Sequence, residues 1–195
     1  MKKVNNREEY LTEINGLLTE NPTCVEIGVE TGGFSLMIYD HLKPKKLYLI
    51  DPWEVGYDKN GEEKTYGGGF QQLSTAHSTE EQYQQVITKF SGEIESGRIE
   101  CKRDYSYNVV NSFPDGHFDF IYIDSCHLYG CVKSDLEIFL PKLKDGGLMC
   151  GHDYTNMANF GVVQAVDEFC VEHDFKMILL SPSTAFDWAL IKNKK

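Results

Sequence analysis

Four short apolar runs in this chain each carry a carboxylate, the first inside the run and the other three at the carboxyl end, and no other feature constrains the fold as strongly. The runs are residues 24–28, 47–51, 118–124 and 148–153, and their acids are Glu26, Asp51, Asp124 and Asp153. Short β-rich runs separated by helix-length segments are typical of parallel strands in an α/β sheet. Because ligands bind beyond the carboxyl ends of such strands, acids repeated at that edge predict a binding site.

Size and charge narrow the class of protein. A chain of 195 residues is expected to fold as one domain, here 1–195, with a sizeable core. The formal net charge of −11 disfavours a polyanionic partner, so we expect a small-molecule substrate and no nucleic acid. No run is long and apolar enough to cross a bilayer, and the six cysteines lack CxxC spacing. We therefore expect a cytoplasmic protein with reduced thiols and no membrane partner, and leave a homodimer open.

The hydrophobic periodicity predicts helices and strands in alternation. An amphipathic helix is expected at 7–19, within an N-terminal segment 1–20. Further strands are expected near 23–28, 46–51, 98–103, 118–124 and 147–151, and helices near 32–42, 78–90, 129–143 and 161–173. Apolar runs at 177–180 and 186–191 predict a closing hairpin. Residues 54–78 contain many glycines and little periodicity, and we expect a lid or substrate insertion there.

The loop that follows the first predicted strand has the features of a nucleoside site. Gly28, Gly32 and Gly33 let the chain turn sharply and let a ligand approach the backbone. The helix that follows presents free N–H groups at its start. Asp51, at the end of the next strand, is placed either to accept hydrogen bonds from ribose hydroxyls or to cap a turn.

The acids beside this loop indicate the charge of the ligand that it suits. Glu26 and Glu30 flank the glycines, and the spacing is not GxGxxG. A pyrophosphate prefers a helix start without neighbouring acids, so a ligand that carries positive charge fits better.

Several motifs, in this order, resemble the class I S-adenosylmethionine-dependent methyltransferases. They are Glu26-x-Gly28-x-x-x-Gly32, Asp51-Pro52-Trp53, the segment 120–129, the segment 135–147, and Gly151-His152-Asp153-Tyr154 with the segment 161–169. The combination is similar to the small-molecule O-methyltransferase-like group called methyltransferase family 24, which borders the metal-dependent macrolide-sugar and catechol enzymes. The resemblance covers about residues 22–192. It implies a Rossmann-like α/β sandwich with a mostly parallel seven-stranded sheet, an antiparallel C-terminal strand and helices on both faces.

The resemblance also implies S-adenosyl-L-methionine as cofactor, whose sulfonium and amino group suit an acidic loop. The residues implied to bind it are Glu26, Gly28, Glu30, Gly32, Asp51, Trp53, Asp104, Ser106 and Asp124. Two of these have alternative roles, Trp53 as a core residue and Asp104 as a helix N-cap. An NAD-dependent oxidoreductase would fit the fold class but not the loop.

A second site follows from the metal-dependent relatives. Their ligands, an acid ending the fourth strand and a pair ending the fifth, correspond here to Asp124, His152 and Asp153. Carboxylates suit Mg²⁺, whereas a histidine suits Mn²⁺, Fe²⁺ or Zn²⁺ better, so a divalent cation (Mg or Mn) stays an open expectation. His152 has two alternative roles: orienting Asp153 or the substrate, or lying buried and bonded to backbone.

Methyl transfer needs an acceptor hydroxyl that loses its proton and aligns with the methyl carbon. His127, three residues after Asp124, matches the position of the lysine base in the catechol enzymes. We therefore predict that His127 and Asp124 are catalytic and that His127 removes the proton. The alternative is that His127 caps the helix that begins near Tyr129. A structural zinc is disfavoured because Cys126, His127, Cys131, Cys150 and His152 lack zinc-finger spacing.

The sequence thus predicts an S-adenosylmethionine-dependent O-methyltransferase that acts on a hydroxyl of a small molecule of the sugar, polyketide or phenol type. A non-catalytic nucleoside-binding or assembly module with the same fold is the alternative. Ser125-Cys126 and His152 favour that alternative, because the family pattern has other residues there.

Overall fold

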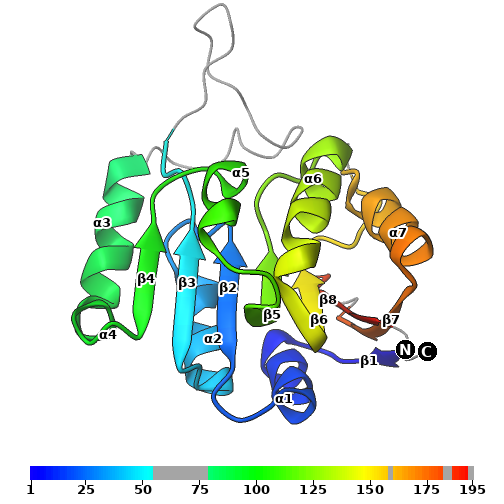
Figure 1. Cartoon of the computed structure of the whole chain (residues 1–195), viewed down its shortest axis with the longest axis horizontal. Coiled ribbons are helices and arrows are strands. Elements are labelled where there is room, and N and C mark those ends of the chain that lie inside the picture. Colours follow the sequence, from blue (N-terminus) through cyan, green and yellow to red (C-terminus); the bar gives the residue numbers. More distant parts are fainter. Residues whose placement is uncertain (55–78, 158–159, 182–185, 193–195) are drawn as a thin grey trace, which may run out of the picture.

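A twisted sheet with helices on both faces forms the body of the chain in the computed structural model, which describes residues 1–54, 79–157, 160–181 and 186–192 (Figure 1). The strand order is β1-β7-β8-β6-β5-β2-β3-β4. The strands are β1 (Lys2–Lys3), β2 (Thr23–Ile27), β3 (Lys46–Ile50), β4 (Ile99–Lys102), β5 (Phe118–Ile123), β6 (Leu143–Gly151), β7 (Phe175–Leu180) and β8 (Trp188–Lys192). Only β8 runs antiparallel, to both β6 and β7.

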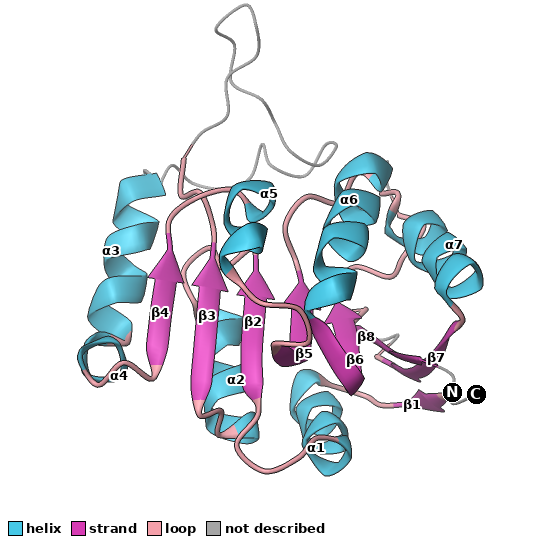
Figure 2. Ribbon diagram, in the orientation of Figure 1, coloured by secondary structure: helices cyan, strands magenta, loops and turns pink. Residues whose placement is uncertain are grey.

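The helices cover both faces of this sheet (Figure 2). They are α1 (Arg7–Leu17), α2 (Gly33–Leu42), α3 (Thr79–Lys89), α4 (Ser91–Glu95), α5 (Ser106–Val109), α6 (Tyr129–Phe139) and α7 (Val162–His173), with 3₁₀ turns η2 (Val110–Ser112) and η3 (Leu140–Lys142). One hydrophobic core joins the sheet to α1, α2 and α3, and a second joins the opposite face to α6 and α7. The alternation of side chains along β2 feeds both cores, since Cys24 faces the first and Val25 the second.

The predicted fold class is confirmed, and the seven expected strands are all present in the described residues. The eighth, β1, is an addition, because two residues paired with Leu179–Leu180 leave no periodic signal. Helices α4 and α5 were also not predicted, because helices of five and four residues are too short to leave a periodic hydrophobic signal. The first helix ends at Leu17 rather than at residue 19.

The segment 54–78, predicted to be a lid, lies outside the described residues except for Glu54. The loop of the closing hairpin at 182–185 lies outside them as well. Within the described part of the chain, no helix has the length and apolar character needed to cross a membrane.

Candidate cofactor and metal site

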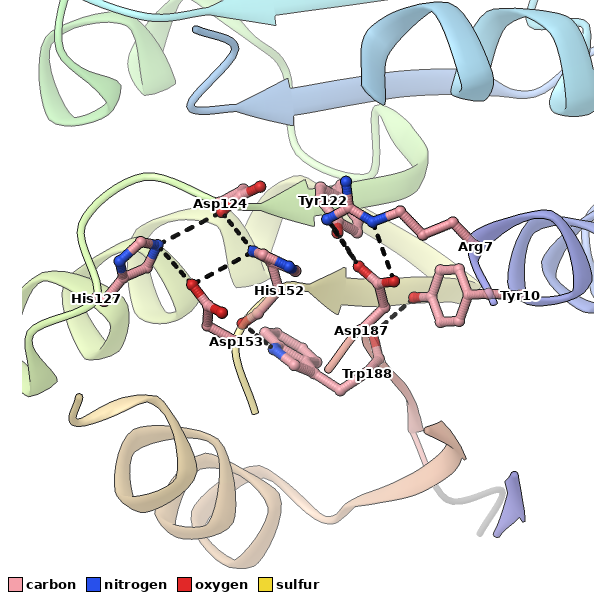
Figure 3. A network of polar contacts seen from close by, with 9 residues as sticks. All are labelled: Arg7, Tyr10, Tyr122, Asp124, His127, His152, Asp153, Asp187 and Trp188. Atoms are coloured by element: carbon pink, nitrogen blue, oxygen red, sulfur yellow. Dashed lines mark hydrogen bonds and ion pairs between the residues drawn. The ribbon is translucent and has the colours of Figure 1, made fainter. Parts of the chain in front are cut away.

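Two aspartates and two histidines meet where β5 and β6 end (Figure 3). His127 Nε2 lies 3.0 Å from Asp153 Oδ2 and 3.5 Å from Asp124 Oδ1. His152 Nδ1 lies 3.2 Å from the same Asp124 oxygen and 3.3 Å from Asp153 Oδ2. One donor atom from each of the four residues falls within 4.8 Å of the others. The structure therefore brings together the three predicted metal ligands and the predicted base.

The parallel pairing of β5 with β6 explains this convergence. Ile123 is the register partner of Gly151, so the residues that follow each strand emerge side by side. Gly151 is required here, because a Cβ would collide with the Trp188 ring and lie 2.5 Å from the Ile123 carbonyl oxygen. The Trp188 indole packs below the cluster and donates to the His152 carbonyl at 3.0 Å.

The four charges determine one another's protonation. Burial by itself lowers the pKa of His127 and His152, but the carboxylates of Asp124 and Asp153 outweigh burial and raise both to about 9. Burial raises the pKa of the two aspartates, and the facing imidazoles outweigh it and hold both values below the ordinary range. Two imidazolium rings therefore face two carboxylates at neutral pH in the metal-free protein.

The Nε2 atom of His127 lies near the carboxylates of both Asp124 and Asp153. This atom is buried and forms no well-aligned hydrogen bond in the described structure, although a carboxylate oxygen is 3.0 Å away. The alternative role as a helix cap does not hold, because α6 has Leu128 as its N-cap and no side-chain cap bond. The ring instead packs against Phe160, and the His127 carbonyl accepts from Gly161 at 2.8 Å.

The glycine loop after β2 lies directly against this cluster. Gly28 has φ +87°, and a Cβ there would collide with the carbonyl oxygen of Asp124. The Asp124 N–H donates to the Ile27 carbonyl at 2.7 Å. The close approach that we predicted for a ligand is thus made by the end of β5, and the loop and the cluster form one continuous site. Gly32, at φ +71°, is the N-cap of α2.

Asp51 holds the loop in shape. Its Oδ2 accepts from the N–H groups of Val29 at 2.8 Å and Glu30 at 3.0 Å, and its Oδ1 accepts from Trp53 N–H at 2.7 Å. This is the turn-capping role that we gave as the alternative, whereas ribose binding stays a prediction. Trp53 is a core residue, 1% exposed, whose indole donates to the Glu30 carbonyl at 2.8 Å.

The two acids that flank the loop lie in different environments, and their binding of the cofactor stays a prediction. Glu26 is 1% exposed, and the Ser35 hydroxyl donates to it. Burial raises the pKa of Glu26 to about 8, so its carboxyl is mostly protonated at neutral pH without a ligand. Glu30 is exposed, at φ +54°. Sequence alone could not separate the two, because burial of Glu26 follows from the helices packed on β2.

Asp104 and Ser106, the residues expected near the adenine, have protein partners. Asp104 Oδ1 accepts from Tyr105 N–H and from Asn108 Nδ2, both at 2.7 Å. The alternative role as a helix N-cap does not hold, because α5 has Tyr105 as its N-cap and no side-chain cap bond. Ser106 donates to Asp135 at 2.5 Å, and Asp135 also accepts from Ser125 at 2.6 Å. Asp135 therefore ties α5 to the segment that leaves β5.

Sequence reasoning missed a second polar network beside the cluster, formed by Arg7, Tyr122 and Asp187 (Figure 3). Asp187 is fully buried and accepts from Arg7 Nε and Arg7 Nη2, both at 3.2 Å, and from the Tyr122 hydroxyl. An aspartate inside the apolar run 186–191 was the one available signal. No described cysteine joins a group of metal donors, and His127 and His152 are grouped with two aspartates instead.

The comparisons with known proteins concern the fold and the family. The chain matches solved structures at low identity, which compares folds alone. The O-methyltransferase NovP has a TM-score of 0.68 and 16% identity, covering 96% of this chain and 80% of NovP. An rRNA methylase from Streptococcus thermophilus has a TM-score of 0.59 and 14% identity, covering 96% and 95%. A Streptococcus mutans structure in complex with S-adenosylhomocysteine (SAH) has a TM-score of 0.61 and 13% identity, covering 97% and 99%.

These likenesses show the Rossmann-like fold of methyltransferases. The family model described as a methyltransferase domain, of type 24, matches residues 25–154, which is more than half of the chain. The chain therefore belongs to this methyltransferase family, as its motifs predicted. No curated protein matches it by sequence.

Proposed function

We propose that this methyltransferase transfers the methyl group of S-adenosylmethionine to a hydroxyl of a small molecule, with help from a divalent cation. The observation that carries the proposal is the Asp124–His127–His152–Asp153 cluster, continuous with the Gly28 loop. The cofactor would lie over that loop, with Asp124 at the boundary between the cofactor and the acceptor. This arrangement would place the methyl carbon beside the carboxyl edge of β5 and β6.

The donor set fits a cation. Asp124, Asp153 and His152 would hold it, and the buried His127 nitrogen without an aligned hydrogen bond agrees with a group held among these side chains. Two imidazoles beside two carboxylates favour Mn²⁺, Fe²⁺ or Zn²⁺ over Mg²⁺. When bound, such a cation would supply positive charge that lowers the pKa of an acceptor hydroxyl.

His127 is the proposed base. Without a cation, its raised pKa keeps the ring protonated and unable to accept a proton at neutral pH. Positive charge held by the two carboxylates would offset their effect on His127 and return its pKa toward the range of a useful base. His127 would then take the hydroxyl proton on Nε2 while the oxygen attacks the methyl carbon, and the bond from that carbon to sulfur would break to release SAH.

Two observations bear on the acceptor. The fold is shared with rRNA methylases, so the fold by itself does not favour a small molecule. The net charge of −11 favours a small-molecule acceptor, because an acidic protein repels a nucleic-acid backbone.

Calorimetry with SAH and with NAD tests the cofactor, and a screen of hydroxylated small molecules with and without EDTA tests the transfer. Binding of SAH but not NAD, with methyl transfer that EDTA abolishes and Mn²⁺ restores, is the expected result. Binding of SAH without transfer to any acceptor would favour the non-catalytic module. Transfer to rRNA fragments alone would refute the small-molecule proposal.

A further inference from the structure

Arg7, the first residue of α1, is held beside the site by a fixed set of contacts. Its guanidinium donates to both oxygens of Asp187 at 3.2 Å, and Nη2 lies 3.4 Å from the Tyr122 hydroxyl. The remaining nitrogen points away from Asp187 (Figure 3). The side chain is 26% exposed, whereas Asp187 is fully buried. A bidentate pair of this kind fixes the plane of the guanidinium and leaves donors for another group.

The neighbours of Arg7 connect it to the cofactor loop. Its guanidinium carbon lies 4.3 Å from the centre of the Phe34 ring, and Phe34 stands in the first turn of α2, just after the loop. The Phe34 and Tyr122 rings are 4.4 Å apart. Arg7 therefore packs at the start of the helix whose N-terminus faces the proposed cofactor.

A buried acid lies on the same face of the sheet. Glu26 is the register partner of Tyr122 in the parallel pair β2–β5, so both side chains project to one face on neighbouring strands. Glu26 bonds to Ser35, the residue after Phe34. The cation of Arg7 and the carboxyl of Glu26 thus approach the loop from one layer of side chains, with Tyr122 and Phe34 between them.

We propose that Arg7 binds the carboxylate of the amino-acid end of the cofactor, while Glu26 takes its ammonium group. This assignment rests on the proposed function. The amino-acid end of S-adenosylmethionine is a zwitterion, and its burial requires a partner of each sign. Asp187 and Tyr122 would be positioning residues, because they touch Arg7 rather than the cofactor.

Two nucleosides separate this role from a merely structural ion pair. SAH carries the amino-acid end, and 5′-methylthioadenosine has the same nucleoside and thioether without it. Calorimetry of the full chain is expected to show SAH binding weakened about 10- to 100-fold in Arg7→Met, with methylthioadenosine binding unchanged within about twofold. Arg98→Met, at an arginine that is paired with Glu93 and half exposed, is the matched control and should leave both affinities unchanged.

A general disturbance of α1 would give a different pattern. If Arg7→Met weakens both nucleosides equally, or leaves SAH affinity unchanged, the assignment is wrong. Should Arg7→Met fail to fold, Arg7→Lys keeps the charge without the bidentate fork, and the same selective loss for SAH is expected in it. A wild-type chain that binds neither nucleoside refutes the proposed function together with this assignment. If the wild-type chain binds both nucleosides and the Arg7 variants bind SAH as tightly as wild type does, only the assignment of Arg7 is refuted.

Discussion

Replacement of Glu26 by glutamine tests whether a buried carboxyl at the cofactor loop is held neutral in the ligand-free protein. Burial raises the pKa of Glu26 from 4.5 to about 8. Between those values the unfolded chain releases the proton and the folded chain keeps it, so the free energy of unfolding falls as pH rises from 4.5 through about 8. The full pKa difference corresponds to about 5 kcal/mol, of which about 2.5 kcal/mol is lost between pH 6 and pH 9.

Glutamine has the same shape and no charge, so Glu26→Gln removes this loss. Urea unfolding of wild type and variant at both pH values, without ligand, is expected to show the variant gaining about 2.5 kcal/mol relative to wild type on going from pH 6 to pH 9. Glu30→Gln, at an exposed acid of the same loop, is the control and should shift by less than about 0.5 kcal/mol. A stability difference between Glu26→Gln and wild type that does not change with pH would refute the reasoning.

Three further predictions concern the cluster and its support. His127→Ala is expected to lower kcat by about 10²- to 10⁴-fold while SAH affinity, measured by calorimetry, stays unchanged; near-normal turnover would rule out the base. Metal affinity should rise between pH 6.5 and about 9, because His127 and His152 must lose protons to admit a cation, and a flat titration would contradict the assigned charges. Gly151→Ala should reduce unfolding free energy by about 2 kcal/mol or more through its collision with Trp188. In the same denaturation assay Gly16→Ala, with nothing within 4 Å, should instead stabilise α1 by about 0.5–1 kcal/mol.

The acid-terminated runs predicted the candidate site because that prediction needs only the local hydrophobic pattern and the rule that parallel strands end at one edge of a sheet. Apolar runs fixed which segments are strands, and parallel pairing then required that their carboxyl ends meet at one edge. Asp124, His152 and Asp153 converge for this reason, since β5 and β6 are neighbours. The bonds of Asp51 to Val29 and Glu30 likewise follow from neighbouring strands, although the pattern left its role open between ribose binding and turn capping.

Features that depend on distant parts of the chain could not be predicted in this way. Arg7 and Asp187 are 180 positions apart, and neither has a local pattern that selects the other. Burial of Glu26 is decided by α1 and α2, which close over one face of β2, whereas the alternation in the sequence gives only the face. The strand β1 forms only because β7 offers an open edge, and its two lysines would otherwise predict a solvated terminus.

Asp124 contacts both the histidine cluster and the Gly28 loop. Its carboxylate faces His127 and His152, and its backbone contacts Gly28 and Ile27. A charge change in the cluster therefore alters the field at the cofactor loop at the point where the sulfonium would lie. Because the protonated, metal-free cluster carries two imidazolium charges against two carboxylates, it attracts a sulfonium less than the carboxylates would alone. If the cofactor lies over the Gly28 loop as proposed, deprotonation of the histidines would strengthen the attraction of Asp124 for its positive charge.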